Sequence, residues 1–77
     1  GPAPRAPELT LREAQVAELV SGGLSNKEIA RELDLSESTV KHHVHSILGK
    51  IGVPSRFQLV REARQDAWQP GPRRALA

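Results

Sequence analysis

The sequence predicts an all-α domain, a compact four-helix bundle that contains a helix-turn-helix. Hydroxyl residues at Thr10, Ser25 and Ser36 each stand where a helix N-cap belongs, just before apolar residues at helical spacing. Ser25 and Ser36 lie only eleven residues apart, which leaves room for a two-turn helix and a tight corner. Two helices joined so closely are typical of a helix-turn-helix.

The first helix is expected over residues 11–21. Glu13 stands three residues after Thr10, so the two side chains can form a reciprocal capping box at the helix start. The helix should end at Gly22 and Gly23 because glycine adopts the left-handed backbone conformation that commonly follows a helix.

A short second helix is expected over residues 26–33, with Ser25 and Glu28 as its capping box. Asp34 then occupies the corner, where a short polar side chain tolerates a positive φ. The corner and the helices on either side of it form the predicted helix-turn-helix, at about residues 25–51.

The third helix is expected over residues 37–51 and is strongly amphipathic. Its apolar residues recur at i, i+4, i+7, i+8 and i+11 and are Val40, Val44, Ile47, Leu48 and Ile51. The opposite face carries Ser38, His42, His45, Ser46 and Gly49. Because this polar face has no carboxylate from Ser38 onward, it suits contact with phosphates and base edges in a DNA major groove.

The fourth helix is expected over residues 56–68, after a further capping box of Ser55 and Gln58. Its apolar residues cover roughly half of the circumference, which is wider than one packed face needs. We therefore expect this helix to meet a second partner in addition to the core.

The folded domain is predicted to span residues 8–68. Residues 1–7 are interpreted as a disordered linker whose Gly1-Pro2 resembles a protease-cleavage scar, and residues 69–77 as a disordered tail. The chain is thus expected to be a domain cut from a longer protein.

Composition excludes several classes of function. The absence of Cys excludes disulfides and thiolate metal sites and fits a reducing cytoplasm. His42 and His45 share a helix face, but no carboxylate is placed to complete a metal site, so no metal is predicted. No apolar run reaches the roughly 18 residues of a membrane span, and no catalytic spacing is present. We expect no enzymatic activity, no cofactor and no membrane partner.

Positive and negative charges nearly balance in this chain. Eleven Lys and Arg residues against nine Asp and Glu give a formal net charge of +2. Between Gly22 and Lys50 the formal charges cancel. Such weak charge predicts weak DNA affinity for one copy and the need for a second copy on the DNA.

Four ordered motifs resemble a known family, the LuxR/GerE-type DNA-binding domain, which is also the effector domain of NarL/FixJ response regulators. The motifs are Leu9-Thr10-Leu-Arg12-Glu13, Gly23-Leu24-Ser25-Asn26-Lys27-Glu28-Ile29-Ala30, Ser36-x-x-Thr39-Val40-Lys41-x-His43 and Gly49-Lys50-Ile51-Gly52-Val53-x-Ser55-Arg56. The resemblance implies a bacterial transcription-factor domain that binds double-stranded DNA as a homodimer, through a recognition helix at about residues 37–51. It also implies a cytoplasmic, nucleoid-associated protein with an upstream receiver or sensor domain.

The resemblance also implies residue roles, position by position. Base contacts fall on Lys41, His42 and His45. Contacts to the phosphate backbone fall on Ser25, Asn26, Lys27, Thr39, Lys50 and Arg56. The dimer contact falls on the fourth helix, at Leu59, Ala63, Ala67 and Trp68. For His43, a packing role between helices stays open beside DNA contact.

Two other readings remain open at this point. The chain could be a protein-interaction module that keeps the fold without binding DNA, and the cancelled charge between Gly22 and Lys50 favours this reading. Region four of a sigma factor shares the helix-turn-helix pattern, although the passage from Gly49 to Arg56 fits LuxR-type domains better.

Overall fold

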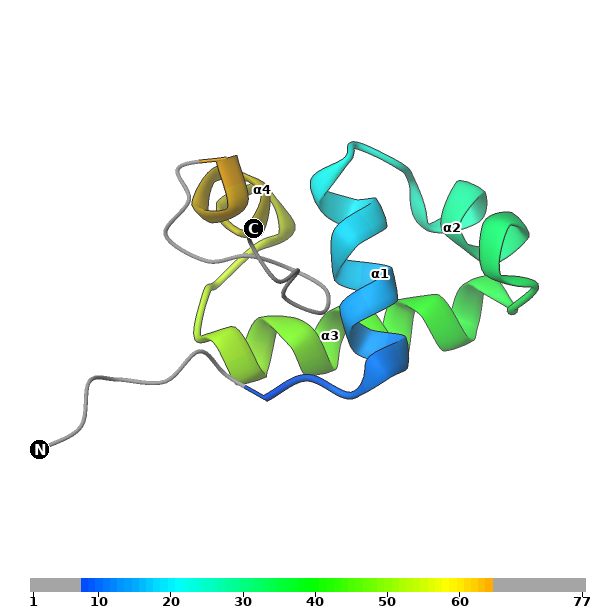
Figure 1. Ribbon diagram of the computed structural model, residues 1–77, viewed down its shortest axis with the longest axis horizontal. Helices are drawn as coiled ribbons and strands as arrows, with labels where there is room; N and C mark the ends of the chain where they lie inside the picture. Colours follow the sequence, from blue (N-terminus) through cyan, green and yellow to red (C-terminus); the bar gives the residue numbers. More distant parts are fainter. Residues whose placement is uncertain (1–7, 65–77) are drawn as a thin grey trace, which may run out of the picture.

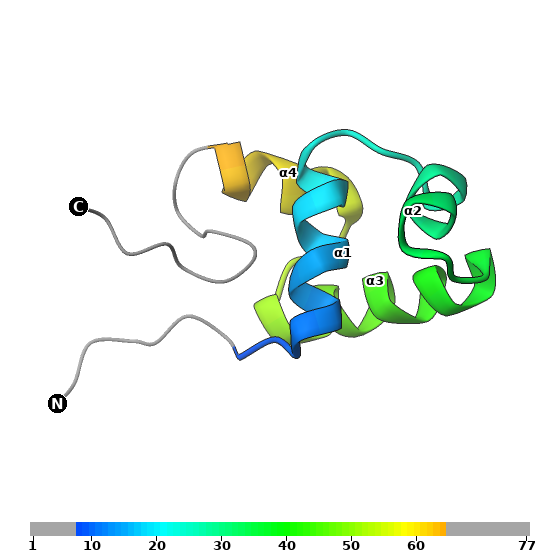
Figure 2. The same cartoon turned by 45° about the vertical axis from the view of Figure 1, so that its right-hand side comes forward.

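The computed structural model describes residues 8–64, which form four helices. In chain order these are α1 (Leu11–Ser21), α2 (Asn26–Leu33), α3 (Glu37–Ile51) and α4 (Arg56–Arg64). α3 is the longest helix, and α1 crosses it with α2 to one side and α4 to the other (Figures 1 and 2). The predicted all-α, four-helix architecture is confirmed.

The first three helices begin where the capping signals predict. Thr10 Oγ1 accepts from the backbone N–H of Glu13 at 3.1 Å, and the Glu13 carboxylate accepts from the Thr10 N–H at 2.9 Å. Ser25 and Glu28 form the same reciprocal box. Ser36 Oγ accepts from the backbone N–H three residues later at 3.1 Å. These bonds satisfy donors that a helix start otherwise leaves without partners.

The cap of α4 is only half of the predicted box. Ser55 Oγ accepts from the Gln58 N–H at 3.2 Å, but the Gln58 amide lies 3.4 Å from a Glu62 carboxylate oxygen, one turn further along the helix. The structure describes α4 as far as Arg64. Ala67 and Trp68, which belong to the predicted helix, therefore lie outside the described residues.

The ends of α1 and α2 also follow the sequence signals. Gly23 has a φ of 95°, and its N–H donates to the Val20 carbonyl while the Leu24 N–H donates to the Leu19 carbonyl. This pair of bonds is a Schellman motif. At the corner of the helix-turn-helix, Asp34 has a φ of 57°, which confirms the predicted left-handed residue.

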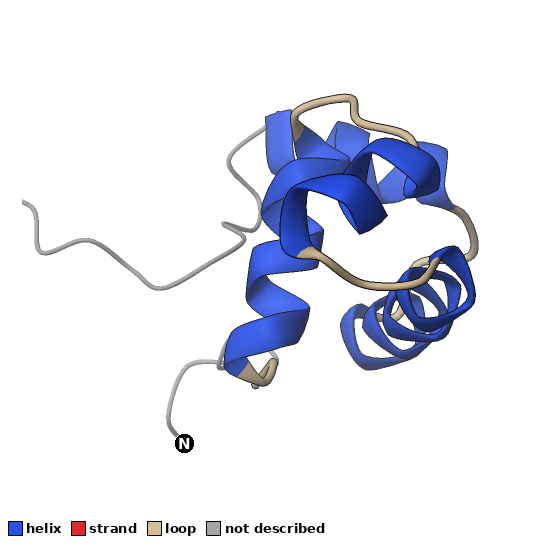
Figure 3. Ribbon diagram, turned by 90° about the vertical axis from the view of Figure 1, so that its right-hand side faces the viewer, coloured by secondary structure: helices blue, strands red, loops and turns tan. Residues whose placement is uncertain are grey.

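A single aliphatic core holds the four helices together. Its buried members are Val16, Ala17, Val20, Ile29, Ala30, Val40, Val44, Ile47 and Leu59. The three that α3 contributes all belong to its predicted apolar face, so α3 packs with that face inward. Figure 3 looks along α3 and shows the other described helices on one side of it, with the opposite side uncovered.

Leu59 requires a correction to the predicted dimer contact. Its side chain is 0% exposed and belongs to the core, so it is not on the surface that a second copy would meet. The apolar arc of α4 was too wide for the sequence to show which part faces the core. Ala63 is partly buried and also packs against the core.

Among residues 8–64, no helix has the length and apolar character needed to cross a bilayer.

Candidate nucleic-acid interface

The uncovered side of α3 forms one wall of a shallow groove of about 550 Å³. The groove is lined by Asn26, Ser38, Lys41, His42, Val44, His45 and Leu48. It therefore brings together the three side chains predicted to contact bases with one side chain predicted to contact a phosphate. Their helices, α3 and α2, are the two members of the helix-turn-helix.

The groove combines polar walls with an apolar floor. Val44 is only 8% exposed and Leu48 is half-buried, whereas Lys41, His42 and His45 are exposed. His45 lies four positions after Lys41 and three after His42, so the three side chains project from neighbouring parts of one helix face. The arrangement offers hydrogen-bond donors and acceptors above a rigid surface.

His43 has a different environment from the two neighbouring imidazoles. It is half-buried and does not line the groove. This position is consistent with the packing role that the sequence left open.

The start of α2 forms one end of the groove. Ser25 and Lys27 are exposed and Asn26 is half-buried. The first turn of a helix carries free N–H groups and the positive end of the helix dipole, so this terminus attracts anions such as phosphate. The hydrogen bond from the Ser25 N–H to the Glu28 carboxylate is the main cause that lowers the pKa of Glu28.

Thr39 lies close to the cap of α3 and is half-buried. Its Oγ1 accepts from the Ser36 hydroxyl at 2.9 Å, and its N–H donates to Ser36 Oγ. The Thr39 hydroxyl still has its own hydrogen to donate, so both of the roles expected of this residue, capping and phosphate contact, are compatible with the structure.

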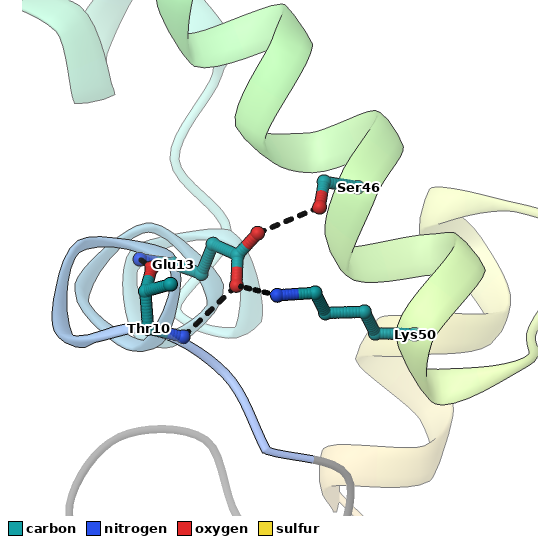
Figure 4. Close-up of polar contacts among 4 residues, drawn as sticks. All are labelled: Thr10, Glu13, Ser46 and Lys50. Carbon is teal, nitrogen blue, oxygen red and sulfur yellow. Dashed lines mark hydrogen bonds and ion pairs between the residues drawn. The ribbon is translucent and has the colours of Figure 1, made fainter.

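Glu13 joins α1 to α3 through a polar cluster that the sequence did not reveal (Figure 4). Lys50 Nζ lies 2.7 Å from Glu13 Oε1, and the Ser46 hydroxyl donates to Oε2 at 2.6 Å. The Glu13 residue is only 5% exposed. The bonds from Lys50, Ser46 and the Thr10 N–H, in that order, lower the pKa of Glu13 to about 2.

This cluster changes the interpretation of two residues on α3. The sequence pattern places Ser46 on the outer polar face, but its hydroxyl bonds to Glu13 on α1 instead. The family resemblance implies a phosphate contact for Lys50, but its ammonium pairs with Glu13, and this ion pair does not support a phosphate contact. A buried carboxylate needs a paired cation, yet nothing in the sequence shows that a cation 37 positions away supplies the pair.

Arg56 also differs from its predicted environment. Its guanidinium donates to Asn26 Oδ1 and, at 2.5 Å, to the carbonyl oxygen of Leu24. Burial lowers the pKa of Arg56 from its ordinary value. The side chain thus joins the start of α4 to the start of α2 and does not extend freely into solvent.

Comparison with known proteins gives the same family that the motifs indicate. The family model described as "Bacterial regulatory proteins, luxR family" matches residues 7–63. A protein of Mycobacterium tuberculosis named as an HTH-type transcriptional regulator is 53% identical over 55 residues, which are 71% of this chain and 6% of that protein.

Two solved structures resemble the fold of this chain. The response regulator ChrA of a heme-sensing two-component system superimposes with a TM-score of 0.70 at 38% identity, over 84% of this chain and 32% of ChrA. VqmA of Vibrio cholera, solved in a ligand–DNA complex, gives a TM-score of 0.73 at 29% identity, over 86% of this chain and 29% of VqmA. The chain therefore spans a third or less of the length of these relatives.

The family match covers all four described helices. It also fixes the class of the domain, which is the helix-turn-helix type of bacterial transcriptional regulators and not an enzyme. With the motifs, the fold and the family model in agreement, this chain belongs to the luxR family of bacterial regulatory proteins.

Proposed function

We propose that this domain is the C-terminal effector module of a bacterial transcriptional regulator and binds a specific DNA sequence with α3 in the major groove. The observation that carries the proposal is the groove, where Lys41, His42 and His45 gather on the exposed face of α3 beside the start of α2. The relative VqmA, whose structure contains DNA, supports it.

In this proposal the three exposed side chains on α3 read base edges. The Lys41 ammonium donates to guanine O6 or N7. The imidazoles of His42 and His45 each offer a donor, and in the neutral form also an acceptor. The half-buried Leu48 below them gives an apolar surface on which a thymine methyl group can pack.

Phosphate contacts come from the start of α2 and from the cap of α3. Ser25, Asn26 and Lys27 present side-chain and backbone donors at a helix terminus that favours anions. Thr39 adds a hydroxyl close to the start of the recognition helix. Such contacts set the register of the helix on the duplex, whereas base contacts provide sequence specificity.

The domain acts as a dimer on DNA, through α4 and the segment that follows it. A formal net charge of +2 gives one copy little attraction for DNA, so two copies on successive major grooves are needed for tight binding. Of the other residues predicted for this contact, Ala63 is partly buried against the core, and Ala67 and Trp68 lie outside the described residues.

The full-length protein joins this domain to a receiver or a sensor domain and acts in the bacterial cytoplasm at the nucleoid. The similar chain ChrA is a response regulator, which supports a receiver domain. Phosphorylation of such a domain, or ligand binding to a sensor, would then control access of the dimer to DNA.

The proposal is tested by selecting duplexes from a random library on the domain and measuring their affinity by fluorescence anisotropy at several salt concentrations. We expect Lys41→Ala to weaken binding to the selected duplex by about tenfold or more, because one good base contact contributes about 1–3 kcal/mol. Arg12→Ala removes the same charge from an exposed position on α1, a helix with no proposed DNA or dimer contact, and serves as the matched control.

A protein-interaction module is the alternative, because the charges between Gly22 and Lys50 cancel. Under that alternative, selection enriches no sequence, and any residual binding is equal for Lys41→Ala and Arg12→Ala. Either result would contradict the proposed function.

A further inference from the structure

The Arg56 side chain bridges two segments that are 30 positions apart in the sequence. One guanidinium nitrogen donates to Asn26 Oδ1, and the other donates to the Leu24 carbonyl oxygen at 2.5 Å. The two acceptors flank Ser25, the N-cap of α2. Arg56 therefore holds both sides of the α2 cap from the start of α4.

The chemistry of this contact determines which way the Asn26 amide faces. A guanidinium has five donors and no acceptor, so only the carbonyl oxygen of the Asn26 side chain can face it. The amide nitrogen, Nδ2, then points away from Arg56 with two hydrogens to donate. Asn26 also lines the groove beside Lys41 and His42.

We propose that Arg56 is a positioning residue for DNA binding, which orients Asn26 so that Nδ2 donates to a backbone phosphate, and that Arg56 does not contact DNA itself. This inference rests on the proposed function of the groove. Arg56 then has an indirect role in place of the phosphate contact that the family resemblance implies. Asn26 keeps its predicted phosphate contact, and Nδ2 is the atom that makes it.

The environment of Arg56 supports an indirect role. Its side chain is partly withdrawn from solvent, and this burial lowers its pKa. Two of its nitrogens already have acceptors within the domain. A direct phosphate contact would compete with these bonds, whereas the amide of Asn26 is oriented by the same bonds.

The first test separates charge from geometry at position 56. Lysine keeps the positive charge but lacks the planar fork that reaches two acceptors together. We therefore expect Arg56→Lys to lose about tenfold in affinity for the selected duplex, as much as Arg56→Ala, because each leaves Asn26 without its orientation. The matched controls are Arg12→Lys and Arg12→Ala, at an exposed position on α1, and they should change affinity little.

A double-mutant cycle then shows whether the two residues act together. If Arg56 acts through Asn26, Asn26→Ala combined with Arg56→Ala should weaken DNA binding no more than Asn26→Ala alone. If Arg56 contacts a phosphate independently, the losses in binding free energy of the two single variants should add in the double variant. Such additivity, or wild-type affinity in Arg56→Lys, would overturn the inference while leaving the proposed function intact.

The variant Asn26→Asp separates a loss of the DNA contact from a loss of folding. The carboxylate still accepts from Arg56 and stands in the first turn of α2, where a negative charge is favourable, so the thermal midpoint should be equal to or higher than that of the wild type. Its DNA affinity should fall by more than tenfold because an acceptor replaces the donor. Wild-type affinity in Asn26→Asp would exclude the Nδ2 contact.

The free protein provides a readout that needs no DNA. The side-chain amide signal of Asn26 in a ¹⁵N-correlated NMR spectrum should move in Arg56→Lys and stay in place in Arg12→Lys. An unmoved signal in Arg56→Lys contradicts the positioning contact itself. If the signal moves but the wild-type domain selects no DNA sequence, the positioning contact exists and the proposed function fails.

Discussion

Glu13 is a capping residue whose carboxylate also bonds to a second helix. One oxygen accepts from the Thr10 N–H and from Lys50, and the other accepts from the Ser46 hydroxyl. Because a buried charge without partners is costly, these bonds are needed to keep the carboxylate ionised inside the domain. Glu13 therefore links the start of α1 to the second half of α3, in addition to the aliphatic core that the two helices share.

The pH dependence of stability should report this residue. The pKa of Glu13 is lowered from 4.5 to about 2, so its ionised form stabilises the folded state fully above pH 4.5. This contribution is lost as the pH falls toward 2. The full shift sets an upper limit of about 3 kcal/mol, and because the Lys50 side chain is 39% exposed, solvent screening reduces the contribution below that limit. We expect the free energy of unfolding, measured by urea titration between pH 6 and pH 2, to fall steeply over that window.

Glu13→Gln is the comparison that isolates the effect. A neutral amide at this position preserves the shape of the side chain and has no proton to gain, so the variant should be less stable at pH 6 and its stability should change less with pH. If the two proteins lose stability in parallel as the pH falls, Glu13 does not carry the effect.

Some of the side-chain contacts of these residues follow from the local sequence, and others do not. The cap at Thr10 depends on residues within one turn, and the sequence predicted it. The pairs of Glu13 with Lys50 and of Asn26 with Arg56 span 37 and 30 positions. Such pairs depend on how the helices pack, which single-sequence periodicity does not specify.

At the scale of elements, α3 contains a glycine, Gly49, at a position with room for a side chain. Gly49 is exposed, and a Cβ built at this position would meet no atom within 4 Å. Gly52 also has open space around it, but its φ of 83° is strained for residues with a side chain. The two glycines therefore differ in backbone conformation and not in packing.

This difference predicts opposite effects for the same substitution. Gly49→Ala should raise the free energy of unfolding by about 0.5–1 kcal/mol, because alanine restricts the unfolded chain and favours the helix. Gly52→Ala should lower it by about 1 kcal/mol, because alanine must adopt the left-handed conformation. Thermal unfolding followed by circular dichroism measures both. A stabilised Gly52→Ala would show that the end of α3 is not held as described.

The bounds of α1, α2 and α3 and the start of α4 were predictable because each depends on residues close in sequence. The start of α2 follows from Ser25 and Glu28, and its end from Asp34. The orientation of α4 was not predictable in the same way. Its apolar residues occupy too wide an arc, and only the packing shows that Leu59 faces the core.

At the scale of the whole molecule, burial of Leu59 affects the expected association state. With that residue in the core, Phe57, which is 71% exposed, is the one large apolar side chain that the described part of α4 leaves open to a second copy. We therefore expect the isolated chain to sediment near its monomer mass of 8.4 kDa across the micromolar range. A dimer whose fraction does not change with concentration would contradict this expectation.

The central claim is that the groove between α3 and the start of α2 binds DNA. The most direct measurement is an NMR titration of the isotopically labelled domain with a short selected duplex at low and high salt. We predict chemical-shift changes concentrated at residues 25–27 and 39–46 that diminish at high salt, because phosphate contacts release counterions. Unchanged signals at these residues, with shifts appearing only on α4 as the protein concentration rises, would instead indicate an association module and contradict the claim.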